Sequence, residues 1–296
     1  MIEIRDLGKD FEQVHAISHL NLEIAPGIAA LVGENGAGKS TLLRLLAGIL
    51  TQSYGNAFVD GYEASSAEAK AKVFFLSDSP DIPNGAFAKD ILALYSCFYN
   101  IDEERFYRLL KKFNLPTDRR LSTFSKGMKR QLFIFLSISI DVPYLLMDEA
   151  FDGLDPVVLD IIKGELLEER EKEKTLVLSS HNMSTLERLA DRFIVLYKGQ
   201  LGESAEVEHL GATLMKYQAI FPSEVTQKDI EELGIDVVNY RKVGSIVNFV
   251  ISGGEKEVEL IKMRFKPTLL ENVALDEEET MRMEMLLTRK RMDGHE

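Results

Sequence analysis

The sequence predicts a two-part α/β protein, with a mainly parallel sheet flanked by helices up to residue 210 and a small α+β domain in residues 211–296. In the first part, short apolar runs typical of buried strands alternate with helical patterns. A glycine-rich loop joins one of these runs to a helix. After Leu210 the order of patterns changes to βαββαβ, which favours a separate ferredoxin-like domain.

The first part begins with two alternating stretches, residues 2–6 and 20–24, which predict strands of an antiparallel entry sheet. Pro26 and Gly27 then turn the chain, and a short strand is expected at residues 56–59. Buried strands, each a mostly apolar run, are predicted at residues 28–32, 73–76, 144–147 and 175–179, with a closing hairpin at 193–203.

Apolar residues at spacings of three and four predict an inserted helical subdomain over residues 87–140. Its helices are expected at residues 86–99, 103–113 and 126–140. A further helix should start at Asp155, as N-cap, with Pro156 in its first position, and run to about Lys172. The charge run from Glu168 to Lys174 is predicted to be a solvated face.

In the second part, strands are predicted at residues 214–221, 235–240, 245–252 and 268–275, and helices at 225–233, 255–264 and 277–289. No catalytic constellation is present in these residues. We therefore expect a packing or dimer-stabilising domain, and a ligand-sensing role is the alternative.

The composition limits the kinds of partner and the cellular environment that we expect for this protein. The formal net charge of -13 argues against DNA, RNA or anionic lipid as partners, because phosphates are held mainly by Lys and Arg. The single cysteine, Cys97, cannot form an internal disulfide, which fits a reducing cytoplasm. No apolar run approaches the ~18 residues that span a bilayer, and the acidic, alternating N-terminus is not a signal peptide.

Residues 33–41, Gly-Glu-Asn-Gly-Ala-Gly-Lys-Ser-Thr, have the spacing of a phosphate-binding loop between a strand and a helix. Gly36 and Gly38 let the backbone amides converge on phosphate oxygens, and the following helix presents free N–H groups. Lys39 adds a full charge, and the hydroxyl of Ser40 can bind Mg²⁺. The sequence therefore predicts a P-loop nucleotide site.

A pair of acids, Asp148 and Glu149, follows the buried strand at residues 144–147. Their side chains should leave the strand on opposite faces. One can hold Mg²⁺, and the other can act as general base toward a water molecule. Since carboxyl ends of parallel strands meet at one edge, Asp78, Asp148, Glu149 and His181 should converge on the P-loop.

With these motifs in order, residues 1–210 resemble the ATP-binding subunit of an ABC (ATP-binding cassette) transporter. The resemblance is carried by residues 33–41 as Walker A, 144–149 as Walker B, Phe124-Ser125-Lys126-Gly127-Met128 as the signature, Asp152-Gly153-Leu154-Asp155 after Walker B, and His181 as the switch histidine. It implies an ATPase that uses ATP and Mg²⁺.

The resemblance also implies roles for single residues. Phe11 would stack on adenine, His181 would contact the γ-phosphate, and Ser125 and Gly127 would bind the ATP of a second subunit. Glu149, His181 and Lys39 would be catalytic, and Ser40, Asp148 and Asp78 would hold the metal. The nucleotide-binding set is Phe11, Gly33, Asn35, Gly36, Ala37, Gly38, Lys39, Ser40 and Thr41.

Two positions depart from the family pattern. Lys126 and Met128 replace a glycine and a glutamine of the signature, although Ser125 and Gly127 are kept. This form resembles the branch of exporters with separate membrane chains. Asp78 stands where the family has a glutamine that touches Mg²⁺ and senses the membrane subunit. Its carboxylate can still face Mg²⁺, but its charge adds to those of the other acids.

The resemblance implies that two ATP-binding subunits, identical or different, close over two ATP·Mg and drive a separate integral membrane permease. The chain would then be cytoplasmic and peripheral on the inner face of the cell membrane, with residues 87–140 as the docking face. The alternatives are a soluble scaffold or switch protein of ABC type, a subunit that binds ATP but barely hydrolyses it, and, as a distant possibility, a P-loop kinase. The transported substrate and its direction are not encoded in these motifs.

Overall fold

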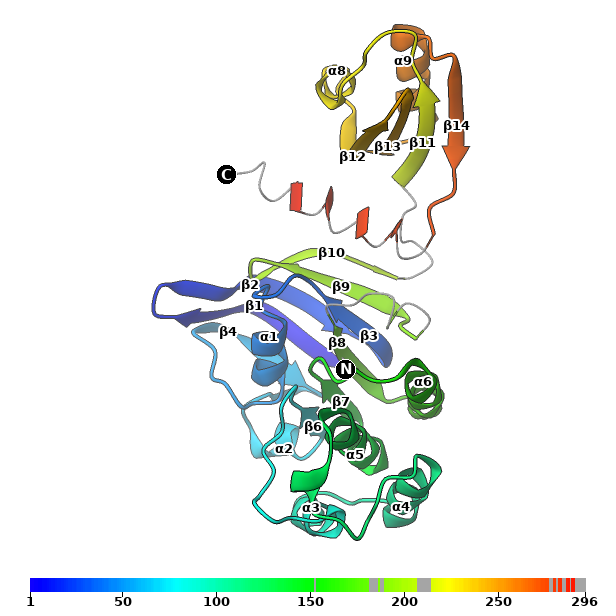
Figure 1. Ribbon diagram of the computed structural model, residues 1–296. Coiled ribbons are helices and arrows are strands. Elements are labelled where there is room, and N and C mark those ends of the chain that lie inside the picture. The colour runs from blue at the N-terminus through cyan, green and yellow to red at the C-terminus, as the bar shows by residue number, and fades with distance from the viewer. Residues whose placement is uncertain are drawn as a thin grey trace. The chain divides into compact units, whose positions relative to one another are not determined.

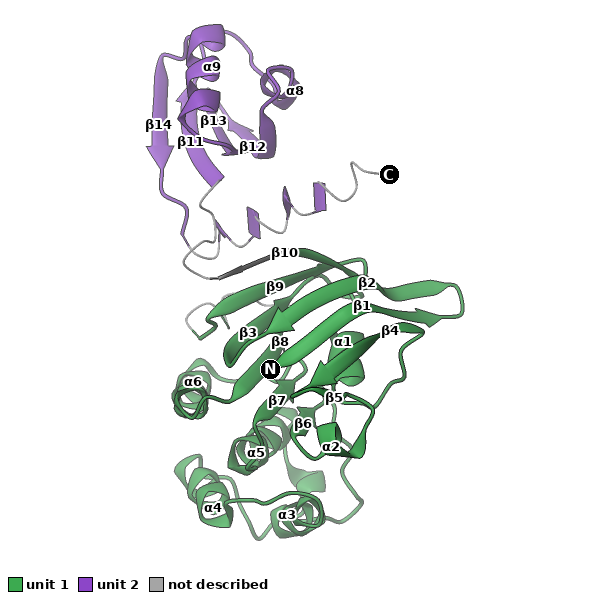
Figure 2. Cartoon of the chain, turned by 180° about the vertical axis from the view of Figure 1, so that it is seen from behind, with its two compact units in different colours: residues 1–204 green, residues 205–296 purple. Residues whose placement is uncertain are grey.

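The computed structural model describes all residues except 152, 181–185, 187–188, 207–213, 277–278, 281, 284–285, 288 and 291–296, and the side chains of 203–206. The chain divides into two compact units, residues 1–204 and 205–296, which Figure 2 colours separately. We call them unit 1 and unit 2 and describe each by itself.

Unit 1 begins with an antiparallel sheet in the order β2-β1-β4-β5 (Figure 1). Its strands are β1 (Ile2–Phe11), β2 (Val14–Ile24), β4 (Tyr54–Val59) and β5 (Tyr62–Glu63). Ile2 pairs with Ile24, and Phe11 pairs with Val14, so β1 and β2 form one long hairpin. The entry sheet predicted from the alternating residues is confirmed, and its first two strands are longer than predicted.

The central sheet of unit 1 has the order β10-β9-β3-β8-β7-β6. Its strands are β3 (Gly27–Val32), β6 (Val73–Leu76), β7 (Tyr144–Met147), β8 (Thr175–Ser180), β9 (Arg192–Tyr197) and β10 (Gln200–Glu206). β3 pairs in parallel with β8 and β9, and β7 pairs in parallel with β6 and β8. The carboxyl ends of β3, β6, β7 and β8 therefore meet at one edge.

Helices surround this sheet, and one group forms an insertion between β6 and β7 (Figure 1). The helices are α1 (Lys39–Leu46), α2 (Ala67–Lys70), α3 (Ala88–Ser96), α4 (Glu103–Lys112), the 3₁₀ turn η1 (Leu121–Thr123), α5 (Lys126–Ser139) and α6 (Pro156–Glu171). α1 buries Leu42, Leu43 and Leu46 in a core shared by both sheets. Asp155 caps α6 by accepting a hydrogen bond from the Val157 amide at 2.9 Å.

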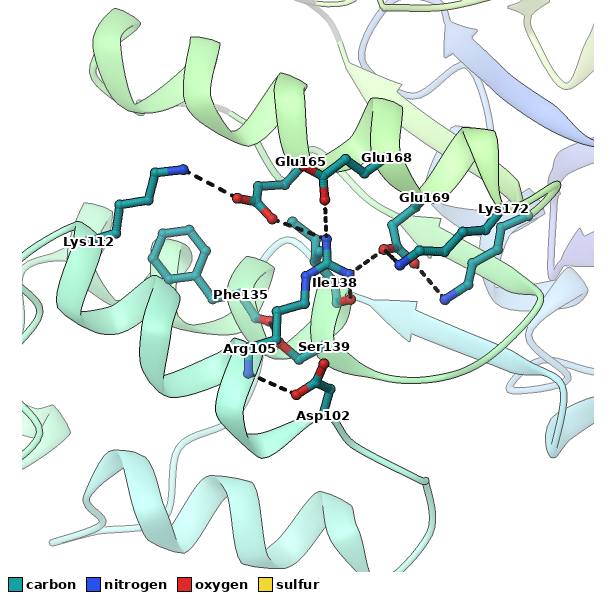
Figure 3. A network of polar contacts seen from close by, with 11 residues as sticks. Asp102, Arg105, Lys112, Phe135, Ile138, Ser139, Glu165, Glu168, Glu169 and Lys172 are labelled. Carbon is teal, nitrogen blue, oxygen red and sulfur yellow. Dashed lines mark hydrogen bonds and ion pairs between the residues drawn. The ribbon is translucent and has the colours of Figure 1, made fainter.

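The insertion is tied to α6 by a buried charge network (Figure 3). Arg105 on α4 contacts Glu165 and Glu169 on α6, and Glu169 also binds Lys172 at 2.8 Å and Lys174 at 2.6 Å. Glu169 is 1% exposed. The prediction that residues 168–174 form a solvated face is therefore wrong at Glu169, because a cation from another helix covers it.

This network also fixes the charge of Glu169. Burial raises the pKa of its carboxyl, but hydrogen bonds from Arg105, Lys172 and Lys174 outweigh burial and lower the pKa to about 2. The Arg105 guanidinium makes two further contacts. It lies 3.7 Å from Oε2 of Glu168, and it donates to the carbonyl oxygen of Ile138 at 3.0 Å, which joins the network to the end of α5.

Unit 2 contains β11 (Leu214–Ile220), α8 (Gln227–Glu231), β12 (Asp236–Val243), β13 (Ile246–Ser252), α9 (Glu255–Phe265) and β14 (Leu269–Val273). The sheet order is β12-β13-β11-β14, and all its pairs are antiparallel. This is the predicted ferredoxin-like βαββαβ arrangement. Of the helix predicted at residues 277–289, the described positions between 279 and 290 are helical, and the others lie outside the described residues.

Candidate functional site

The loop between β3 and α1 lies at the carboxyl edge of the central sheet. Gly36 and Gly38 have φ values of 83° and 105°, which an L side chain rarely adopts. A Cβ on Gly38 would also lie 2.5 Å from the carbonyl oxygen of Ala16. Gly38 is the N-cap of α1, so the first amides of this helix have no side-chain cap and can bind an anion.

Lys39, the first residue of α1, is held inside this loop. Its Nζ donates hydrogen bonds to the carbonyl oxygens of Gly33 at 2.7 Å and Glu34 at 3.2 Å. It also lies 3.7 Å from Oε1 of Glu149. Gly33 is needed beneath it, because a Cβ there would meet the Leu196 carbonyl oxygen at 2.4 Å. The ammonium group is therefore fixed at the centre of the loop.

The two acids after β7 have different surroundings. Asp148 is fully buried, and its Oδ1 accepts a hydrogen bond from the hydroxyl of Ser179 at 2.7 Å. Its Oδ2 has no hydrogen-bond partner among the described residues. Glu149 has a φ of 45°, and its amide donates to the same hydroxyl at 2.9 Å. Asp148 is thus fixed below the loop, while Glu149 turns into the pocket.

Lys39 and Glu149 line a pocket of about 380 Å³. The predicted residues in its wall are Asn35, Gly36, Gly38, Lys39, Ser40, Thr41 and Glu149. Gly33 and Ala37 are buried behind it. The sequence interpretation missed the remaining wall residues, Val14, His15, Ala16 and Lys198, which come from β2 and from the turn between β9 and β10. Ser179 was also missed, although it ends the apolar run of β8.

A second pocket, of about 530 Å³, lies between the end of β6 and the start of α5. Lys126, Gly127 and Asp78 are in its lining. Arg130 donates to the carbonyl oxygen of Asp78 at 2.9 Å, and Ser125 caps α5 by accepting from the Met128 amide at 3.2 Å. Asp78 therefore does not line the pocket that holds Ser40 and Glu149.

Two predicted residues remain apart from these pockets. Phe11 is 42% exposed at the end of β1, with the Lys9 ammonium 4.9 Å from its ring centre, and it is not part of the first pocket wall. His181, and Asp152 of the loop after β7, lie outside the described residues.

Comparisons with known proteins agree with this geometry. The family described as "ABC transporter" matches residues 17–152. The chain is 31% identical over 205 residues to the lantibiotic transport ATP-binding protein SrtF of Streptococcus pyogenes, covering 68% of this chain and 89% of that protein. It is 25% identical over 283 residues to the ABC transporter ATP-binding protein YtrB of Bacillus subtilis (strain 168), covering 94% and 96%. The similarity to YtrB is therefore not confined to unit 1.

Solved structures show the same fold. The ATP-binding subunit of an ABC transporter has a TM-score of 0.66 at 24% identity, over 72% of this chain and 92% of that one. A dimeric ATP-binding cassette, described as a post-hydrolysis state bound to ADP and Pi, has a TM-score of 0.63 at 20% identity, over 70% and 99%. From the relatives and the fold together, the chain belongs to the ABC transporter family, as an ATP-binding subunit with the ATPase activity of that family.

Proposed function

We propose that this ATPase hydrolyses Mg²⁺-bound ATP between two cassettes and drives a separate membrane permease. The proposal rests on three residues grouped around the glycine loop. Lys39 is a buried cation, Asp148 is a buried acid, and Glu149 is an acid that faces the pocket.

The loop fits the phosphates of ATP. Gly36, Gly38, Lys39, Ser40 and Thr41 line one pocket, and the start of α1 adds the positive end of a helix. Lys39 is already desolvated and held by two carbonyl oxygens, so little ordering is needed when it contacts a phosphate oxygen. Phe11 would stack on the base, as in the family resemblance.

The residues present fit a magnesium ion. Ser40 lies in the pocket wall, and Asp148 carries a buried oxygen that no described residue bonds, as expected for a group that binds a cation. Ser40 and Asp148 would hold the ion, and Asp78 remains a predicted third ligand although its present pocket is the other one. A bound Mg²⁺ supplies positive charge that stabilises the phosphate oxygens.

Glu149 is the proposed general base. It faces the pocket beside Lys39, so its carboxylate can accept the proton of a water molecule that attacks the terminal phosphate. The neighbouring Ser179 hydroxyl fixes its backbone. His181 is proposed from the family resemblance as the contact of the γ-phosphate.

The second cassette would contribute its signature. Ser125 and Lys126 are exposed at the start of α5, a helix of 14 residues whose amides can face an incoming phosphate. In such a pair, the signature of one subunit covers the ATP held by Lys39 of the other.

The helical insertion is the proposed contact with the permease. It carries exposed apolar side chains on and beside α3, including Leu94 and Phe98, and Phe98 is 75% exposed. Among the described residues, no helix combines the length and apolarity needed to cross a membrane. Purification of the native chain in detergent tests this contact, since a multi-span protein should accompany it in near-equal amount. Only cytosolic partners would contradict the permease and favour the scaffold alternative.

Glu149→Gln tests the site. We expect unchanged ATP affinity, a dimer trapped with ATP and turnover reduced about 100-fold to 10,000-fold, because proton transfer by a positioned base contributes that much. ATP binding, steady-state hydrolysis and light scattering measure these results. Glu63→Gln is the matched control, since Glu63 is exposed on β5 away from the pocket. Normal hydrolysis by Glu149→Gln would remove Glu149 as the base.

A further inference from the structure

The sheet of unit 2 has one face covered by helices and one polar face. Tyr217, Val247, Phe249 and Ile251 point to the first face and pack with α8 and α9. Residues between them in sequence point the other way. On that second face, Lys216 pairs with Val250 and Gln218 pairs with Asn248, so two polar side chains of β11 lie beside β13.

A register shift in β12 adds more polar groups to the second face. Val237 pairs with Ile251, but Asn239 pairs with Val250, so one extra residue is accommodated between them. Without this bulge, Asn239 would lie opposite Phe249, on the helix-covered face. With it, Asn239 and the following alternate residue, Arg241, lie on the second face.

The second face is hollowed into a pocket of about 240 Å³, all of whose lining residues belong to unit 2. Polar walls come from β11, β12 and β13 and from Glu279 and Arg282 of the C-terminal segment. Val250 and Met283 give it an apolar part, and both belong to a small buried cluster between the sheet and this segment. The pocket therefore offers polar contacts on one side and an apolar surface on the other.

The charges of this pocket favour an anion. Lys216 binds both oxygens of Glu279 at 2.7 Å, which neutralises the only acid among the described residues of the lining. Arg241 and Arg282 also line it, and within the described part of the chain neither guanidinium group has an ion-pair or hydrogen-bond partner. The lining is thus net positive in a protein with a formal net charge of -13.

The side chain of Asn248 belongs to the lining of the same pocket. The side chain of Gln218 donates from Nε2 to Oδ1 of Asn248 at 3.1 Å. This bond occupies the carbonyl oxygen of Asn248, so the amide group of Asn248 is left to donate, and no acceptor for it occurs among the described residues.

We propose that unit 2 binds a small organic anion in this pocket: a carboxylate or phosphate monoester with a short apolar body. Arg241 and Arg282 contact the charged group, since a guanidinium matches the two oxygens of a carboxylate or phosphate. The apolar body lies on Val250 and Met283. The proposal is independent of ATP hydrolysis, because every group it uses lies within residues 205–296.

Methyl NMR of the full chain, with ¹³C-labelled methionine, tests this site. Three probes separate its parts: isovalerate has the charge and the apolar body, isopentylamine has a similar body with the opposite charge, and inorganic phosphate has the charge alone. We expect isovalerate to shift the Met283 signal saturably and the amine to leave it unchanged. The Met215 signal is an internal control, since Met215 packs against the helix-covered core.

Variants then test the two arginines. Arg241→Gln and Arg282→Gln should each weaken isovalerate binding about tenfold, which corresponds to one charge-assisted contact. Both side chains are exposed, so folding should be retained, and the Met215 signal reports it. Lys256→Gln on α9 makes the same charge change away from the pocket and should bind normally.

Two results would overturn the proposal: no saturable shift of Met283 with any probe, or equal binding of the amine. Phosphate binding as tight as that of isovalerate would assign the pocket to inorganic anions and would contradict the proposed contact of an apolar body with Val250 and Met283. The phosphate titration is repeated in Lys39→Ala, so that binding at the glycine loop of unit 1 is recognised.

Discussion

Unit 1 contains two clusters of buried charge that are built in opposite ways. In the glycine-loop cluster, one oxygen of Asp148 has no hydrogen-bond partner among the described residues, and the Lys39 ammonium lies 3.7 Å from Glu149. In the helix cluster, both oxygens of Glu169 are paired with cations, and Arg105 is paired with Glu165 as well. The first cluster thus leaves a carboxylate oxygen unpaired, whereas the second pairs both oxygens of Glu169 and, among the described residues, leaves only Nε of Arg105 buried without a hydrogen bond.

This difference distinguishes a cluster that binds a ligand from a cluster that stabilises the fold. A buried polar atom without a partner costs about 1–3 kcal/mol of stability, so it persists where a ligand completes it. A network in which the buried carboxylates are paired with cations stabilises one arrangement of helices, because removing any member leaves a buried charge uncompensated. Changes in the helix cluster should therefore alter folding, whereas changes in the glycine-loop cluster should alter ligand binding and turnover.

The largest expected effect on folding is that of Arg105→Met. Removing this guanidinium leaves Glu165 and Glu169 buried with fewer cations, which should cost about 3–5 kcal/mol of unfolding free energy. Urea unfolding measures the loss, and ATP affinity below the transition should be unchanged. Arg108→Met, on the exposed side of α4, is the control. Normal stability of Arg105→Met would contradict a structural role for the cluster.

The pH dependence of stability should come next. The pKa of Glu169 is about 2 in the folded protein against 4.5 as its ordinary value, so its contribution is complete above pH 4.5 and is lost as pH falls toward 2. The difference is worth about 3 kcal/mol. Urea titrations between pH 7 and 2.5 measure it. Glu169→Gln should be less stable at pH 7 and should flatten the profile, and an unchanged slope would contradict the pairing.

In the glycine-loop cluster, Ser179→Ala should change metal binding more than folding. The hydroxyl orients Asp148 and holds the Glu149 amide, and loss of such an orienting contact typically weakens metal affinity about 10-fold to 100-fold. The Mg²⁺ dependence of ATP hydrolysis measures the shift. Ser137→Ala, which removes another buried hydroxyl bonded within α5, should leave that dependence unchanged. Equal effects of both variants would show that Ser179 acts only through packing.

The smallest effect is expected for an exposed pair. Lys262 and Glu259 on α9 lie 2.6 Å apart, but both side chains are about half exposed. Solvent screens such pairs, so Lys262→Gln should leave the urea midpoint unchanged. A clear loss of stability would mean that the distance between two charges, and not their burial, determines how strongly a pair stabilises the protein.

Local patterns predicted most of the fold. The apolar runs gave β6 and β7 their observed bounds, and the glycine spacing located the loop before α1. These features depend on neighbours in sequence, as does the βαββαβ order of unit 2. Most of the predicted residues that line the first pocket also depend on local patterns, because they belong to the glycine loop or to the acids after β7.

Other features depend on contacts between distant residues. Glu169 has the spacing of a surface residue on α6, and only α4 shows why it is buried. Lys198 reaches the first pocket because the turn after β9 lies beside the glycine loop, and Ser179 reaches Asp148 because β8 pairs with β7. No local pattern specifies these neighbours. Asp78 lies with the signature residues because Arg130 of α5 holds its backbone.

The bulge in β12 limits which sequence changes unit 2 can accept in evolution without losing the pocket. Point substitutions alter one side chain and leave the others on their faces, and deletion of Val238 would remove the bulge but keep Asn239 opposite Val250. Deletion of Tyr240, in contrast, would exchange the faces of the β12 residues that follow it, and Arg241 would then point into the apolar core. Relatives that keep the pocket should therefore vary in the residues of this strand but keep their number from Asn239 onward, so a gap after Asn239 in an alignment would be a sharper sign of a lost site than a mismatch.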